Sequence, residues 1–220
     1  MELYLDSVNF EEIDQAVSLG FLKGITTTPT LMHKYGVKDT SQAIVKLSHM
    51  TDNVHVEALG ETCDQILEEA RMIEELEGVN NSLIFKIPIT NEGLKATAKL
   101  SSHGKRTNIH LVYTLNQAYL AASAGATYIC PLVGRLHDQG HDSFSLIEQS
   151  VKMIENYGYS TKVMVSSVRH PDHVRMALLC GAHSITIPWK VLNMLTNNLL
   201  TENGIDLFKE HMDSLNEKND

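Results

Sequence analysis

Short apolar segments rich in β-branched residues alternate along the chain with longer segments whose apolar residues recur at helical spacing. This alternation is typical of repeated βα units, which build a parallel sheet. The pattern predicts eight strands, at 2–6, 24–27, 54–59, 83–89, 107–112, 128–133, 162–168 and 184–188. It predicts helices at 11–19, 62–76, 92–101, 116–124, 145–157, 172–179, 190–197 and 205–215.

Eight strands followed by helices close naturally into a barrel, whereas an open sheet of that size would leave two edges to protect. We therefore expect one domain over residues 1–220, a single (β/α)8 TIM barrel of the α/β class. The extra C-terminal helix, at about 203–216, would cover a barrel end or pack on a neighbouring subunit. Prolines fall at the ends of alternate predicted strands, where pairing stops, at Pro29, Pro88, Pro131 and Pro188.

Composition limits the function classes. The 220 residues carry a formal net charge of −9, which argues against binding to nucleic-acid phosphates. No stretch approaches the roughly 20 apolar residues that a membrane span needs, and the N-terminus does not resemble a secretory signal. The three cysteines form no CxxC pair, which favours free thiols in a reducing compartment and a cytoplasmic location.

Lys86 interrupts an otherwise apolar strand. Strand alternation sends it into the barrel interior together with Ile84 and Pro88. Burial disfavours the charged form of an amine, and only the neutral amine attacks a carbonyl. Lys86 is thus a candidate Schiff-base nucleophile, and the alternative is a buried lysine paired with a carboxylate.

Two carboxylates, Asp6 and Glu57, end or lie within other predicted strands. Aldol cleavage needs a base for a hydroxyl proton and a proton shuttle for loss of water from the carbinolamine. Asp6 and Glu57 suit these tasks, although both could instead be counter-ions of Lys86 or caps at strand ends.

Two arginines near predicted strand ends, Arg135 and Arg169, could hold a phosphate or sulfonate together with the hydroxyl of Ser167. The alternative is that they are surface arginines paired with nearby acids such as Asp138.

With these residues in place, the chain resembles the small transaldolase and fructose-6-phosphate aldolase family of class I aldolases along nearly its whole length. The matching segments are 1–6, 24–30, 85–90, 116–131, 134–135 and 166–169. The resemblance implies that Lys86 forms the Schiff base, that Asp6 is the acid/base at the donor's C4 hydroxyl, and that Glu57 acts with a bound water. It also implies that the terminal anion and hydroxyls of the sugar contact residues in the set Thr26, Thr28, Arg135, Ser167 and Arg169.

With a glutamate at position 57 the chain resembles transaldolases, whereas the aldolases of this family carry glutamine there. The resemblance therefore implies transfer of a dihydroxyacetone unit from a ketose to an aldose, in carbohydrate metabolism of the pentose phosphate type. It implies no metal or organic cofactor, sugar-phosphate or sulfonated sugar substrates, and a homo-oligomer such as a pentamer or decamer.

Three positions depart from the family pattern. Thr28 replaces an asparagine that contacts donor hydroxyls, Leu132 replaces an aromatic residue, and His110 stands where a threonine helps to hold the catalytic water. An imidazole donates and accepts protons near neutral pH, so His110 is a candidate catalytic residue. The departures would suit a sulfonated ketose such as 6-deoxy-6-sulfofructose, and their bland interpretation is drift in an inactive relative.

Other functions stay open at this point. Aldol cleavage without transfer is one alternative, and a non-catalytic sugar-phosphate binding barrel is another. A metal-dependent aldolase or hydrolase is a third, suggested by His137 and His141, but Gly140 indicates a loop there and no third ligand is obvious.

Overall fold

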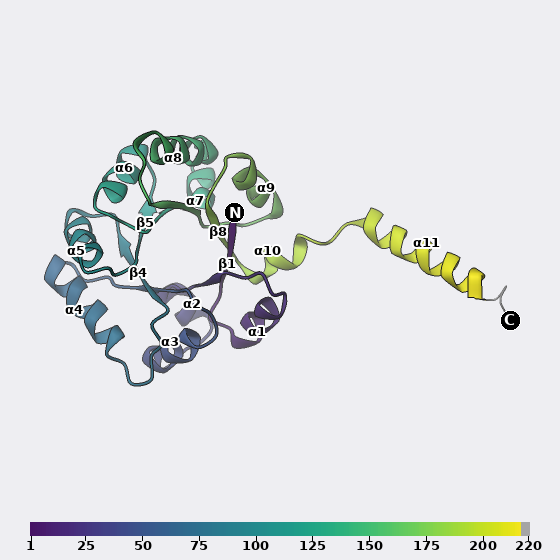
Figure 1. Ribbon diagram of the computed structural model, residues 1–220, viewed down its shortest axis with the longest axis horizontal. Coiled ribbons are helices and arrows are strands. Elements are labelled where there is room, and N and C mark those ends of the chain that lie inside the picture. Colours follow the sequence, from purple (N-terminus) through teal and green to yellow (C-terminus); the bar gives the residue numbers. More distant parts are fainter. Residues whose placement is uncertain (217–220) are drawn as a thin grey trace.

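A computed structural model describes residues 1–216 and shows a closed barrel of eight parallel strands in the order β1 to β8 (Figure 1). Strand β1 pairs with β2 on one side and with β8 on the other, which closes the sheet. The strands are β1 (Glu2–Asp6), β2 (Gly24–Thr26), β3 (Val54–Glu57), β4 (Leu83–Pro88), β5 (Thr107–Val112), β6 (Tyr128–Pro131), β7 (Lys162–Val165) and β8 (Ser184–Ile187). The predicted TIM barrel is confirmed.

Helices surround the sheet as an outer ring (Figure 1). They are α1 (Phe10–Ser18), α2 (Pro29–Lys34), α3 (Thr40–Ser48), α4 (Cys63–Glu74), α5 (Asn91–Ser102), α6 (Leu115–Ser123), α7 (Val133–Asp138), α8 (Ser143–Tyr157), α9 (Pro171–Leu179) and α10 (Trp189–Met194). One further helix, α11 (Leu199–Asn216), lies outside the ring. The sequence pattern did not predict α2, α3 or α7. Two of these are single short helices of six residues, too brief to show a helical period.

Several strands end earlier than predicted, and the backbone gives the reason. The strand predicted to reach residue 133 ends at Pro131, because α7 begins at Val133. The strand predicted to reach residue 168 ends at Val165, and two residues later Ser167 has a φ of 59°, which no strand can continue through.

Threonines fix where several helices start. Thr62, Thr90 and Thr114 each accept a hydrogen bond from a backbone N–H in the first turn of α4, α5 and α6. Such N-caps satisfy helix donors that lack an intrahelical partner. Each threonine follows a strand closely, so the cap sets the direction in which the chain leaves the barrel mouth.

The hydrophobic core has two parts. The larger part lies between the sheet and the helices, and β4 contributes Phe85 and Ile87 to it. A smaller cluster fills the barrel interior and consists of Tyr4, Ile84, Tyr128, Cys130 and Met164. Lys86 alternates with Phe85 and Ile87, so it points inward above Ile84, as predicted.

Polar groups in the barrel interior pair with one another. The Tyr4 and Tyr128 hydroxyls lie 2.9 Å apart, and the Asn108 amide nitrogen lies 2.9 Å from Nδ1 of His55. Burial, followed by the charges of Lys86 and Arg106, holds the pKa of His55 well below its usual range. This neutral layer closes the floor beneath Lys86.

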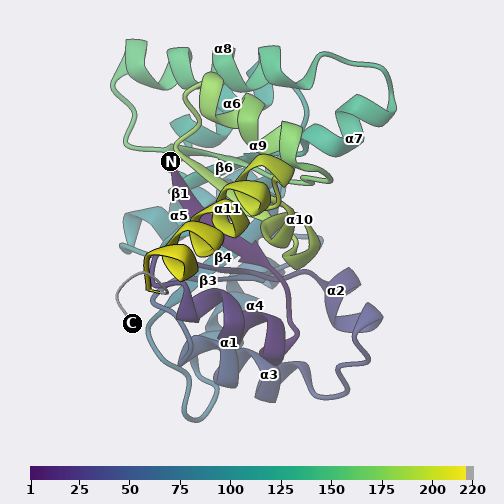
Figure 2. The ribbon, with the colours of Figure 1, turned by 90° about the vertical axis from the view of Figure 1, so that its right-hand side faces the viewer.

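Helix α11 extends away from the barrel (Figures 1 and 2). It begins at Leu199, several residues before the predicted start, and none of its residues is buried. Among the described residues, no helix combines the length and apolar character needed to cross a membrane.

Candidate active site

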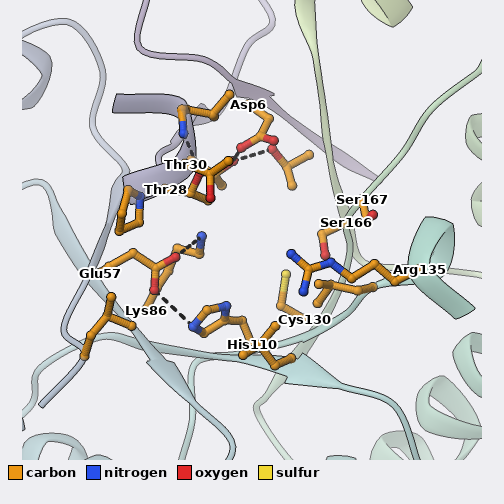
Figure 3. A pocket seen from close by; sticks show the side chains of 17 residues that line it. Asp6, Thr28, Thr30, Glu57, Lys86, His110, Cys130, Arg135, Ser166 and Ser167 are labelled. Carbon is orange, nitrogen blue, oxygen red and sulfur yellow. Dashed lines mark hydrogen bonds and ion pairs between the residues drawn. The ribbon is translucent and has the colours of Figure 1, made fainter. Parts of the chain in front are cut away.

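A cavity of about 490 Å³ opens at the C-terminal ends of the strands. This is the end of a TIM barrel where active sites form. Seven strands contribute a lining side chain: Asp6, Thr26, Glu57, Lys86, His110, Cys130 and Thr186. The fold thus brings together side chains that are far apart in the sequence (Figure 3).

The Lys86 ammonium points into this cavity, where it meets Glu57 (Figure 3). Its Nζ lies 2.8 Å from Glu57 Oε1 and donates a second hydrogen bond, of 2.9 Å, to the Thr27 carbonyl. The two charged side chains are only 6% and 8% exposed. The sequence analysis offered two interpretations of Lys86, a cavity nucleophile or a buried lysine paired with a carboxylate. The structure is compatible with both, because Lys86 lines the cavity and is paired with Glu57.

His110 contacts the other oxygen of the same carboxylate. Its Nε2 lies 3.0 Å from Glu57 Oε2, although the ring N–H is not aimed straight at that oxygen. The three side chains form a row along one wall of the cavity, with Glu57 in the middle (Figure 3).

Glu57 is held in its charged form. Burial alone would raise its pKa, but contact with His110 and the charge of Lys86 outweigh this and lower it. At neutral pH the carboxylate is therefore negatively charged and forms an ion pair with the ammonium beside it.

Asp6 occupies a different environment on the neighbouring wall. Burial raises its pKa, and Glu57 adds to the effect, while Lys86 and the hydrogen bond from Thr26 oppose it. The Thr26 hydroxyl donates to Asp6 Oδ1 at 2.7 Å and lies 2.6 Å from the Thr186 hydroxyl. The two carboxyl groups thus have pKa values that move in opposite directions, which is how one site obtains both an acid and a base.

Two non-glycine residues have a left-handed backbone, Leu111 and Ser167, and both line the cavity. Leu111 is the extra residue of a β-bulge, because His110 pairs with Cys130 whereas Val112 pairs with Pro131. Bulges and strained backbone gather at functional sites, where they aim a side chain. Here the bulge sits directly after His110.

Helix α7 approaches Ser167 very closely. A Cβ atom on Gly134 would lie 2.1 Å from the Ser167 carbonyl oxygen, so only glycine fits. The contact fixes Arg135, the next residue, on the far wall of the cavity from Lys86 (Figure 3). Its guanidinium points into the cavity and lies 3.4 Å from the Tyr113 hydroxyl.

Arg169 takes a different place from the one predicted. It is not among the described residues that line the cavity, and its guanidinium pairs with Asp138. Neither arginine lies at a strand end, because Arg135 is in α7 and Arg169 follows β7 by four residues. In this structure Arg169 thus forms the pair with Asp138 that the sequence analysis gave as the alternative, whereas Arg135 contacts Tyr113 and lines the cavity.

Thr28 also has a structural task. Its hydroxyl accepts a hydrogen bond of 3.1 Å from the Leu31 N–H and so caps α2. The residue lines the cavity, as do Pro29 and Thr30 from the start of the same helix.

The sequence analysis missed several lining residues. Thr186 had a usable signal, because Ser184 and Thr186 alternate with Ile185 and Ile187 and so place polar groups on the inner face of β8. Ser166 had a similar signal, because it follows the inward-pointing Met164 by two residues. Leu111 had none, since a bulge with a left-handed backbone brings it to the cavity.

The sequence matches the model of the family described as Transaldolase/Fructose-6-phosphate aldolase over residues 3–220. The chain belongs to this family. Members with curated names are similar along almost the whole length. A "Probable transaldolase" from Thermoanaerobacter sp. (strain X514) is 41% identical over 211 residues, covering 96% of both chains. One from Maridesulfovibrio salexigens is 40% identical over 215 residues, covering 98% of this chain and 99% of the relative.

A solved structure shares the fold. The crystal structure of a "putative fructose-1,6-biphosphate aldolase" from Coccidioides immitis superposes with a TM-score of 0.60 at 12% identity, covering 87% of this chain and 75% of that one. The family match and the relatives at about 40% identity identify the chain as an enzyme of the transaldolase type.

The electrostatics of the site predict how Asp6 responds to loss of the ammonium. Lys86 lowers the pKa of Asp6, so Lys86→Met should raise the titration midpoint of that carboxyl. Carboxyl ¹³C NMR of aspartate-labelled protein measures this, with Asp6→Asn to assign the signal. Lys95→Met removes an exposed lysine from α5 and should leave the midpoint in place. A midpoint that stays or falls in Lys86→Met contradicts the arrangement.

Proposed function

We propose that this chain is a transaldolase that carries a dihydroxyacetone unit on Lys86 as a Schiff base. The observation that carries the proposal is the Lys86 amine inside the cavity, 2.8 Å from the Glu57 carboxylate. An amine at this position attacks a bound ketose only after it loses a proton, and Glu57 is the nearest base.

The reaction balances with the groups around the cavity. The Lys86 nitrogen adds to the C2 carbonyl of a ketose, and the resulting carbinolamine loses water to give the protonated imine. A base then removes the proton of the C4 hydroxyl, the C3–C4 bond breaks, and an aldehyde leaves. The remaining enamine attacks the carbonyl of an aldose acceptor, which takes a proton, and water releases the new ketose from Lys86.

Asp6 is proposed as the acid/base at the C4 hydroxyl. Its raised pKa favours a group that can hold a proton and return it, whereas Glu57 is kept charged. Thr26 and Thr186 orient Asp6 through the chain of short hydrogen bonds, which leaves its second oxygen available to substrate. Thr28 borders the same part of the cavity and is proposed to contact donor hydroxyls.

His110 and Glu57 are proposed to move protons during gain and loss of water at C2. The imidazole lies 3.0 Å from the carboxylate and at the cavity surface, so it can pass a proton between Glu57 and a water molecule.

Arg135 and Ser167 are proposed to bind the terminal anion of the sugar. Arg135 faces Lys86 across the cavity, as an extended ketose with its carbonyl at Lys86 requires (Figure 3). Arg169 joins them only if it leaves Asp138. Only Arg135 of the two arginines faces the cavity directly, and a single arginine suits a sulfonate, which has one negative charge. We therefore propose a 6-sulfonated ketose as well as a 6-phosphate as donor.

The test combines trapping with a transfer assay. Borohydride reduction with donor should add one reduced dihydroxyacetone unit to wild-type protein and to Lys95→Ala, but not to Lys86→Ala, as mass spectrometry reports. Fructose 6-phosphate and 6-deoxy-6-sulfofructose are compared as donors, with and without an aldose phosphate acceptor. Consumption that depends on acceptor supports transfer.

Each other outcome selects an alternative. Equal release of aldehyde without acceptor favours fructose-6-phosphate aldolase-type cleavage. Donor binding without a trapped adduct favours a non-catalytic sugar-phosphate binding barrel. Faster turnover of fructose 6-phosphate than of the sulfonated ketose removes the sulfonated donor.

His110→Ala should lower the transfer rate by about 10²–10⁴-fold, the usual size of acid–base catalysis, because the proton path through Glu57 is interrupted. Affinity for the anion should stay the same, since Arg135 and Ser167, and not His110, are proposed to bind it. Steady-state kinetics with inorganic phosphate as competitive inhibitor measures both quantities. His103→Ala, an exposed histidine after α5, is the control. An unchanged rate in His110→Ala refutes the role.

We also propose that α11 packs on a neighbouring copy of the chain, which would make the protein a homo-oligomer. The helix exposes Ile205, Phe208 and Met212 at helical spacing along one face, with no part of its own barrel covering them. An uncovered apolar face of this kind indicates an interaction surface.

Light scattering after gel filtration tests this proposal. The full chain should have a mass of several subunits, such as a pentamer or decamer, and Phe208→Asp should shift the population to smaller species. Asn203→Asp adds a similar charge to the opposite side of α11 and should leave the assembly intact. A wild-type chain that runs as a monomer contradicts the proposal.

A further inference from the structure

Three histidines from two helical segments meet outside the sugar cavity. His137 lies in the last turn of α7, His170 is the residue before α9, and His173 is in the first turn of α9. One ring nitrogen from each lies within 4.8 Å of the others. Helices α7 and α9 lie side by side in both views (Figures 1 and 2). None of the three is among the described residues that line the sugar cavity.

The distances fit a shared metal ion. His137 Nδ1 lies 3.2 Å from His173 Nε2. Two nitrogens bound to one zinc ion at about 2.0–2.1 Å and the tetrahedral angle lie roughly 3.3 Å apart. The rings of His170 and His173 have centroids 3.8 Å apart, because a spacing of three residues places them on one side of the helix start. The third nitrogen, from His170, lies within 4.8 Å of the other two.

His173 is an unusual residue for a structural core. It is only 1% exposed, and its Nδ1 has no hydrogen-bond partner. Phe144 packs edge-on against the ring and holds its orientation.

Charges around the cluster tolerate a divalent cation. Arg169 is adjacent in sequence, but Asp138 pairs with its guanidinium. Asp172 lies close enough to interact electrostatically with both His170 and His173. Arg175 holds one Asp172 oxygen, so this carboxylate acts as a counter-charge beside the cluster.

We propose that His137, His170 and His173 bind a late first-row divalent metal ion, with zinc as the best match and water in the fourth position. Imidazole nitrogens favour zinc, copper and nickel over magnesium or calcium, which prefer oxygen ligands. The sequence expectation was no metal, and it singled out His137 with His141. The fold instead joins His137 to two histidines that lie more than thirty residues later.

The ion would tie α7 to α9. These two segments flank Ser167 and carry Arg135 and, just before α9, Arg169. The ion is structural in this proposal and takes no part in the chemistry at Lys86. The site therefore stands independently of the proposed function.

Metal titration of tag-free, chelator-stripped full-length protein tests the site. Calorimetry with Zn²⁺ should show one equivalent per chain in wild type, and Co²⁺ should give the visible absorption of tetrahedral coordination. His137→Ala and His170→Ala should each weaken Zn²⁺ binding at least tenfold. Both residues are exposed, so the variants should keep the wild-type circular dichroism. His141→Ala, an exposed histidine in the adjoining loop, should bind as wild type does.

Thermal unfolding gives a second measurement. Zn²⁺ should raise the Tm of wild type and of His141→Ala but not that of His137→Ala, because only a ligand bound to the native state stabilises it. Three results overturn the proposal: no stoichiometric binding in wild type, equal affinity in wild type and the two alanine variants, or loss of binding in His141→Ala alone. Any of them would mean that His137 and His173 form only a hydrogen bond and no metal site.

Discussion

The ion pair between Lys86 and Glu57 is the constraint on which the rest of the site depends. Removing two charges from water costs several kcal/mol per ion, and only good geometry and further hydrogen bonds offset this. The barrel supplies them through the Thr27 carbonyl and through His110. A well-packed apolar pair would serve stability as well or better, so a pair kept inside a cavity at this cost indicates that the charges have a chemical use.

The pair also explains how the neighbouring groups divide their tasks. One ammonium lowers the pKa of both carboxyl groups, yet only Glu57 touches it directly. For Asp6 the effect of burial outweighs that of the ammonium, so its pKa rises. A single cation between two carboxyl groups thus yields one charged group and one group ready to hold a proton.

The sequence was informative wherever a polar residue interrupts an apolar strand. Lys86, Asp6, Glu57 and His110 all reach the cavity for this reason, because alternation and the parallel barrel together decide where a strand residue points. The same reasoning does not extend to residues outside the strands. Arg135 lies on α7, whose position depends on the close contact of Gly134 with Ser167, and no local pattern reveals such a contact.

The histidine cluster is a second case in which local sequence patterns do not reveal a contact between distant elements. His170 and His173 are neighbours by helical spacing, and this much is local. Their meeting with His137 depends on how α7 packs beside α9, which is a property of the whole barrel. Residue types therefore identified candidate ligands, but only the fold could choose among eleven histidines.

At the end of the cavity proposed to bind the sugar anion, one of the two arginines, Arg169, does not yet face the cavity. Arg169 and Asp138 are 48% and 47% exposed, and an ion pair at such exposure contributes only about 0.2–1 kcal/mol. A sugar anion that accepts two charge-assisted hydrogen bonds from a guanidinium gains more than this pair loses. If the proposed function holds, the substrate would thus recruit Arg169 at little cost, whereas Arg135 already faces the cavity. A doubly charged phosphate gains more from the second arginine than a singly charged sulfonate does, so the Arg169–Asp138 pair is where the two donors would be told apart.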